Sequence, residues 1–149
     1  MKNRICLAIA AGLCVATASP AHARNIKRLL PISAAMEAKD LQPKLDGSTK
    51  LSFGKAKSAD GTRTVRTEVT LGKVNLRGKS EDAACNSAFL TALAELQSRA
   101  KRYNADAVVN IVSYYKRAEM SSATEFECHE GSGYMAVELR GDLVKTAEK

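Results

Sequence analysis

The sequence has no tryptophan, and its four tyrosines and three phenylalanines make up only 5% of the chain. So few aromatic side chains argue against a surface that stacks on sugars or on nucleic-acid bases. Histidine is scarce too, because only His129 lies beyond the first 23 residues. A Ser-His-Asp or Cys-His site would have to use it. Nothing in the sequence places a serine beside it, and Cys128 falls on the opposite face of an expected strand, so we expect no enzymatic activity.

Phosphate-binding motifs are absent as well. Residues 47–55 end in Gly-Lys, but the spacing is wrong for a P-loop, and Ala56 stands where Ser or Thr is required. Residues 131–136 match the pattern G-x-G-x-x-A, yet they lie between two expected strands instead of opening a helix. We therefore expect no nucleotide cofactor.

One apolar run stands out, at the N-terminus. Lys2 and Arg4 precede an uncharged run over residues 5–16, and residues 21–23 read Ala-His-Ala, a small-x-small cleavage site. The run is shorter than the roughly 20 residues that span a bilayer. A retained anchor or a buried core helix is the alternative. We expect residues 1–23 to be a signal peptide cleaved after Ala23, and residues 24–149 to be a single periplasmic domain without a membrane span.

The charge of the mature chain indicates a class of partner. Cleavage removes two of the 23 basic residues and none of the 16 acidic ones, so the net charge falls from +7 to +5. An exported basic protein seldom meets nucleic acid, whereas it does meet anionic lipid, lipopolysaccharide and acidic glycan. We expect contact with an unidentified envelope protein or such an anionic surface, and no nucleic-acid partner. A solvated surface that the charge merely keeps soluble is the alternative. An oligomer is compatible with this expectation.

The hydrophobic pattern predicts an α+β domain in which a long helix packs on a mainly antiparallel sheet. The predicted order is a short helix, two strands, the long helix and three strands, and residues 24–32 are expected to be loose. The expected elements are a helix over 34–41, strands over 50–53 and 62–71, a helix over 81–103, and strands over 105–115, 123–128 and 134–144.

Two of these elements carry clear periodic patterns. Ser80 is a good N-cap for the long helix, and an apolar stripe runs along it at helical spacing. Its members are Cys85, Phe89, Ala92, Leu96, Ala100 and Tyr103. In the strand over 62–71, one face carries apolar side chains and the other carries polar ones. The apolar set is Val65, Val69 and Leu71, and the polar set is Arg66, Glu68 and Thr70.

Two cysteines, Cys85 and Cys128, survive cleavage. Cys85 lies on the apolar stripe of the long helix, and Cys128 lies beside Phe126 on the apolar face of its strand. An even number of cysteines in an oxidising compartment indicates a bridge, which here would join helix to sheet. Two buried free thiols, or a redox or metal role, are the alternatives, although the chain has no C-x-x-C motif.

The strand over 123–128 also suggests a metal site. Glu125, Glu127 and His129 alternate along one face, about 7 Å apart from one to the next. Two carboxylates and an imidazole are ligands that divalent ions accept. They would need Glu119, Glu130 or a partner chain to close a tight site. The alternatives are an ordinary solvated strand face and an acidic patch that meets a basic partner.

The segment before this strand is the expected contact region. Tyr114, Tyr115, Lys116 and Arg117 begin a polar connection that runs to residue 122. We expect them to contact a partner, while packing in the core or at a sheet edge is the alternative for the two tyrosines.

Residues 84–144 resemble known families. Residues 98–109 read SRAKRYNADAVV, which is similar to the A…A…GANAVV signature of YbjQ-like domains. The periplasmic domain of the Rcs stress-sensor lipoprotein is similar. Together with residues 109–115 and 121–129, the stretch looks closer still to small exported proteobacterial proteins that are labelled excinuclease ATPase subunit.

These resemblances imply a fold and a compartment more than a reaction. The YbjQ-like resemblance implies a long helix on an antiparallel sheet, sometimes assembled in rings, and is linked by name to heavy-metal binding without ligands that map here. The Rcs sensor resemblance implies an envelope protein whose disulfides tie helix to sheet, although this chain lacks a lipobox and a second such bond. The excinuclease label does not fit an exported chain without a P-loop. We therefore predict a non-enzymatic periplasmic binding or sensing domain, with a divalent-metal-binding protein as the alternative.

Overall fold

The computed structural model describes residues 26–38, 43, 45–55 and 62–146, so the expected signal peptide lies outside the described residues. No helix in these ranges is long and apolar enough to cross a membrane. The elements in chain order are β1 (Ile26–Pro31), α1 (Ile32–Glu37), β2 (Lys50–Phe53), β3 (Thr62–Asn75), α2 (Glu81–Arg102), β4 (Ala107–Ser113), the 3₁₀ turn η1 (Tyr115–Arg117), β5 (Glu125–Glu130) and β6 (Tyr134–Thr146).

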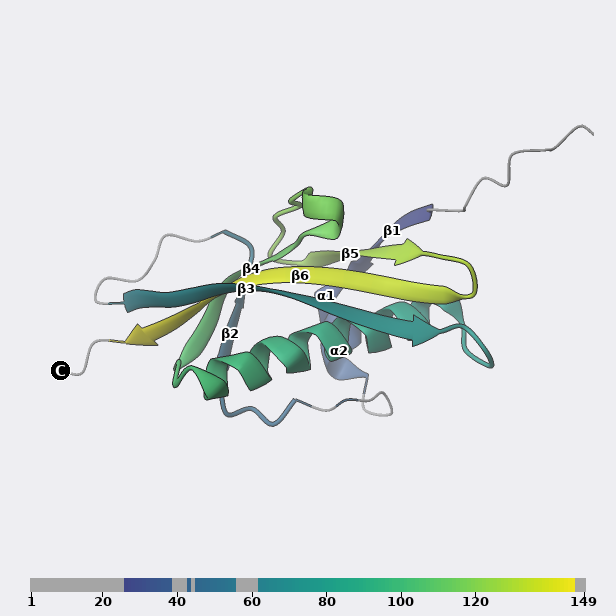
Figure 1. Ribbon diagram of the computed structural model, residues 1–149. Helices are drawn as coiled ribbons and strands as arrows, with labels where there is room; N and C mark the ends of the chain where they lie inside the picture. The colour runs from purple at the N-terminus through teal and green to yellow at the C-terminus, as the bar shows by residue number, and fades with distance from the viewer. Residues whose placement is uncertain (1–25, 39–42, 44, 56–61, 147–149) are drawn as a thin grey trace, which may run out of the picture.

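The domain is α+β, as predicted, with α2 packed on one strongly curled six-stranded sheet. The order along the sheet is β1-β5-β6-β4-β2, and β3 pairs with β6 along nearly its whole length. All pairs are antiparallel except β2 with β4. Figure 1 shows α2 below β3 and β6, and the η1 turn above them. The sheet therefore has an inner face that contacts α2 and an outer face that carries η1.

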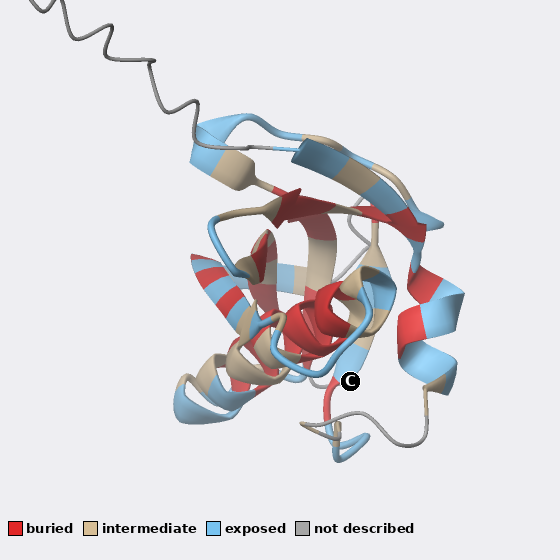
Figure 2. Ribbon diagram, turned by 90° about the vertical axis from the view of Figure 1, so that its right-hand side faces the viewer, coloured by how far each residue is buried: buried red, intermediate tan, exposed pale blue. Residues whose placement is uncertain are grey.

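The sequence explains where α2 begins and what it buries. The hydroxyl oxygen of Ser80 accepts a hydrogen bond from the backbone N–H of Ala83, and two acidic residues occupy the first turn. The predicted stripe faces the sheet, and Figure 2 shows the buried part of α2 inside the curve of the strands. At the centre of the core, the Phe89 ring stacks on Phe126 with the ring centroids 4.3 Å apart.

The pairing of Cys85 with Cys128 follows from this packing. Both side chains are fully buried, one on α2 and one on the inner face of β5. The structure joins them by a disulfide bond across 43 residues of sequence, as expected from the helix stripe and the strand face. The bond ties α2 to the sheet.

The expectation that residues 24–32 are loose is wrong for the described part. Residues Ile26–Pro31 form β1, which pairs with β5 in antiparallel register. Leu30 is buried in the core, and Arg28 contacts Glu81 at the start of α2. Tertiary pairing supplies hydrogen bonds that the basic composition of the segment does not reveal, so the sheet has one strand more than predicted.

The face of β3 that lies against α2 is the opposite of the one the hydrophobic pattern favours. Thr70 and Glu68 are buried against α2, whereas Leu71 is 58% exposed and Val69 is 36% exposed. The Thr70 hydroxyl donates to the carbonyl oxygen of Ala92 at 2.8 Å. A Cβ atom on Gly72 would lie 1.8 Å from the carbonyl oxygen of Ala88. The helix approaches β3 too closely for large apolar side chains, so small and polar residues line the contact.

Candidate functional site

The outer face of the sheet carries the sequence-predicted contact residues. They belong to a segment of residues 114–119, here called the 114–119 loop, which begins the connection from β4 to β5 and lies over that face. Its two ends are closed by a two-residue bridge: Ser113 and Met120 exchange backbone hydrogen bonds of 3.1 and 2.9 Å. The loop is therefore held at its base by the strand that precedes it.

Contacts with β6 hold the loop down on the sheet. The backbone N–H of Tyr114 donates to the carbonyl oxygen of Glu138 at 2.8 Å. The Glu138 carboxylate accepts a hydrogen bond of 3.3 Å from the backbone N–H of Lys116. The Arg140 guanidinium lies over the Tyr114 ring, 4.8 Å from its centroid. The first half of the loop thus has a defined conformation set by backbone and side-chain groups of β6.

The second anchor is His129 on β5. Its ring stacks on that of Tyr115, with the centroids 3.4 Å apart, and its Nε2 lies 2.7 Å from a carboxylate oxygen of Glu127. His129 is only 5% exposed. Burial lowers its pKa below the ordinary 6.5; the bond with Glu127 opposes this shift, and the charges of Lys27 and Lys116 reinforce it. The histidine thus packs as a flat ring beneath Tyr115.

The tip of the loop is strained. Lys116 and Arg117 adopt positive φ angles of 52° and 66°, the left-handed region that glycine favours. An L-residue with a Cβ atom costs roughly 1–2 kcal/mol there. Such conformations persist only where the surrounding structure determines them, and they cluster at functional sites. Both side chains are exposed, so the strain places two cationic side chains at the surface.

Three acidic groups near the loop, on Glu119, Glu127 and Glu138, are engaged within the domain. Glu119 lies 2.5 Å from both Lys55 and Arg140, and the hydrogen bond from Lys55 leads the interactions that hold its pKa below the usual range. Glu127 is paired with His129, and Glu138 holds the loop. The exposed charge of the loop tip is therefore positive.

Apolar and aromatic side chains extend this surface on both sides. On β1, Leu29 is 50% exposed and lies opposite Glu127. On β3, the exposed Leu71 lies opposite Glu138, and the Lys73 ammonium lies 3.7 Å from the centroid of the Tyr134 ring. Sequence reasoning missed these two flanks, because it placed β1 in a loose segment and assigned the apolar face of β3 to the interior.

Acidification is expected to destabilise the domain between the folded-state pKa of His129 and about pH 6.5. In that window the unfolded chain binds more protons than the folded one, so the free energy of unfolding rises with pH. Urea unfolding from about pH 5 to 7 should show this slope, and His129→Gln should flatten it. Burial raises the pKa of Glu68, but the hydrogen bonds and charges of Arg99 and Arg66 together lower it, and hydrogen bonds from Thr146 lower the pKa of Asp106, so both carboxyl groups act at lower pH. An unchanged slope in the variant would assign the effect to another group.

The metal hypothesis places Glu125, Glu127 and His129 on one strand face, and the structure brings only two of them together. Glu127 and His129 are in contact, while Glu125 is exposed at the start of β5. Within the described ranges, no three His, Cys, Asp or Glu groups gather closely enough to hold a metal ion. Nor is the face an ordinary solvated one, because His129 is buried beneath Tyr115. Cys128, bound in the disulfide, offers no thiol nucleophile beside it.

Comparison with known proteins does not assign the chain to a family. No protein-family model matches the chain, and no curated protein matches it either. The resemblances to YbjQ-like domains, to the Rcs sensor domain and to exported proteobacterial proteins therefore stay predictions.

Proposed function

We propose that the chain is an exported, non-enzymatic binding domain of the cell envelope, whose outer face contacts an acidic segment of a partner protein. The observation that carries the proposal is the 114–119 loop, in which two consecutive cationic residues are held in left-handed conformations at an exposed tip. Contact would be made by Lys116 and Arg117, with Tyr114 and Tyr115 as the anchors beneath them.

Pre-organisation supports a binding role for this loop. A partner gains affinity when the contacting side chains are already ordered, because less conformational entropy is lost on association. The 114–119 loop is ordered by Glu138, by His129 and by the bridge at its base. The left-handed residues at its tip contribute no side chain to the core. Their unfavourable backbone therefore has the role of presenting the two cations to the partner.

The surroundings of the loop favour a protein over a lipid headgroup as the partner. Tyrosine and arginine are enriched in protein interfaces, and exposed leucines beside them supply apolar contact. Leu29 and Leu71 flank the loop on two different strands. A lipid surface needs several basic residues together, at about 1 kcal/mol each, whereas the loop tip offers two.

The compartment belongs to the same proposal. A buried disulfide in a domain of this size is typical of oxidising compartments and is rare in the cytosol. It agrees with cleavage after Ala23 and release into the periplasm. The partner is accordingly expected among envelope proteins that expose acidic residues.

Site-specific photo-crosslinking in the native envelope tests the contact surface. A benzoylphenylalanine at exposed Ala118 should form one dominant protein adduct, while the same group at exposed Ser98 on α2 should not. Lys116→Glu with Arg117→Glu should reduce the adduct about tenfold or more, since like charges would then face each other. Lys79→Glu with Arg102→Glu, which changes the net charge equally at exposed positions around α2, is the matched control.

Three results would contradict the proposal. Equal adduct yields from positions 118 and 98 would mean that the partner does not bind preferentially to the outer face. An unchanged adduct yield after reversal of both loop charges would show that the partner segment is not acidic. An adduct to lipid alone would replace the protein partner with an anionic surface.

A further inference from the structure

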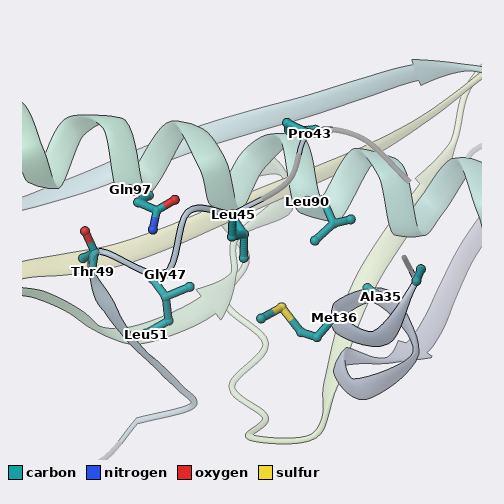
Figure 3. A pocket seen from close by; sticks show the side chains of 10 residues that line it. Ala35, Met36, Pro43, Leu45, Gly47, Thr49, Leu51, Leu90 and Gln97 are labelled. Carbon is teal, nitrogen blue, oxygen red and sulfur yellow. The ribbon is translucent and has the colours of Figure 1, made fainter. Parts of the chain in front are cut away.

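A cavity of about 610 Å³ lies beside α2, between this helix, α1 and the start of β2. Its described walls come from α1, the segment before β2, the start of β2 and α2. Figure 3 shows α2 on one side of the cavity, and Met36 of α1 and Leu51 of β2 on the other. Cavities of roughly 300–1,000 Å³ are the usual size for small-molecule sites.

The lining is predominantly apolar. Leu90 of α2 is 5% exposed, Leu45 and Leu51 are half-buried, and Met36 is 45% exposed at the rim. A flexible methionine at the rim of an apolar cavity adapts to ligands of different shape. The walls are suited to a hydrocarbon chain more than to a polar metabolite.

Gln97 is the polar exception in this wall. It lies two turns after Leu90 on α2 and is only 4% exposed. Its carbonyl oxygen accepts a long hydrogen bond of 3.4 Å from the backbone N–H of Asp46. Its amide nitrogen is buried and has no hydrogen-bond partner among the described residues. In Figure 3 that nitrogen points from α2 into the space toward Thr49 and Leu51.

A buried amide donor without an acceptor is unfavourable, and native proteins rarely leave one without a reason. An oxygen that enters the cavity with an apolar ligand would supply the acceptor. We propose that the cavity binds a single acyl chain, with its hydrocarbon against Leu45, Leu51 and Leu90 and its carbonyl oxygen accepting a hydrogen bond from Gln97 Nε2. A free fatty acid and an acyl ester both present this chemistry, and the site is separate from the outer-face contact surface.

Fluorescence titration with dansyl-labelled undecanoic acid tests the site on the mature protein. The probe should bind saturably, and lauric acid, methyl laurate and dodecane should be compared as competitors. Gln97→Leu keeps the size of the side chain and removes the donor. The substitution should weaken the binding of the competitor that carries the recognised oxygen about fivefold to tenfold. It should change the affinity for dodecane by less than about twofold. Weaker binding of methyl laurate in the variant indicates an esterified lipid as the ligand. Weaker binding of lauric acid alone indicates a free fatty acid.

Blocking variants locate the binding. Leu45→Trp should fill the cavity and abolish saturable binding, and Met36→Trp at the exposed rim serves the same purpose if the first variant does not fold. Thermal unfolding of each variant confirms that it is folded. The proposal is overturned if the parent protein shows no saturable binding, if both blocking variants bind as the parent does, or if Gln97→Leu affects dodecane and the acyl competitors equally.

Discussion

Replacement of Cys85 and Cys128 by alanine is expected to cost the domain about 4 kcal/mol of unfolding free energy. The bond closes a loop of 43 residues, and the chain-entropy relation gives about this value for such a loop. Because domains of this size are stable by only about 5–15 kcal/mol, the melting temperature should fall by roughly 10–20 °C. Thermal unfolding followed by circular dichroism measures the shift.

Reduction of the parent protein provides the matched control for this variant. Reductant removes the same cross-link without changing a side chain, so the reduced parent and the double-alanine variant should melt within a few degrees of each other. Alanine is preferred to serine because both positions are fully buried and a hydroxyl there would need a partner. A loss below about 1 kcal/mol would show that α2 stays on the sheet without the bond.

Gly72→Ala is expected to be the most damaging single-methyl change in the sheet, at about 3 kcal/mol. The added Cβ atom would lie 1.8 Å from the carbonyl oxygen of Ala88 and 2.9 Å from the backbone nitrogen of Ala92. Both contacts are with the backbone of α2, so the helix itself would have to move away from β3. Urea unfolding compares the free energies of variant and parent.

Gly78→Ala is the control for this substitution. Gly78 has a φ of +73°, and a Cβ atom there would meet nothing within 4 Å. Alanine at this position should therefore cost only the left-handed backbone penalty of about 1–2 kcal/mol. If Gly72→Ala proves no more destabilising than Gly78→Ala, α2 does not approach β3 as closely as described.

The long helix and its bridge could be predicted because their signals are local. Ser80, the acidic first turn and the apolar stripe mark α2 within one stretch of sequence, and Cys85 falls on that stripe. The face of β3 could not be predicted in this way, because it depends on how closely α2 approaches Gly72. Likewise, β1 depends on pairing with β5, a strand about 100 residues later in the chain.

At each of the two candidate sites, the sequence predicts some features and only the fold shows the others. The sequence points to Lys116 and Arg117 as exposed polar residues, but their left-handed backbone and the stacking of Tyr115 on His129 are visible only in the fold. Gln97 reads in sequence as an ordinary helix residue. Its significance comes from burial beside a cavity whose walls come from α1, the stretch 43–51 and α2.

The proposed export into an oxidising compartment would account for the disulfide and for the proposed class of partner, and one mass measurement tests it. The chain is purified from a periplasmic extract, alkylated with and without prior reduction, and its intact mass is determined. We expect a mass that begins at Arg24 and two thiols that react only after reduction, which the Cys85–Cys128 bond requires. A full-length mass, or two thiols that react without reductant, would contradict export and with it the proposed envelope partner.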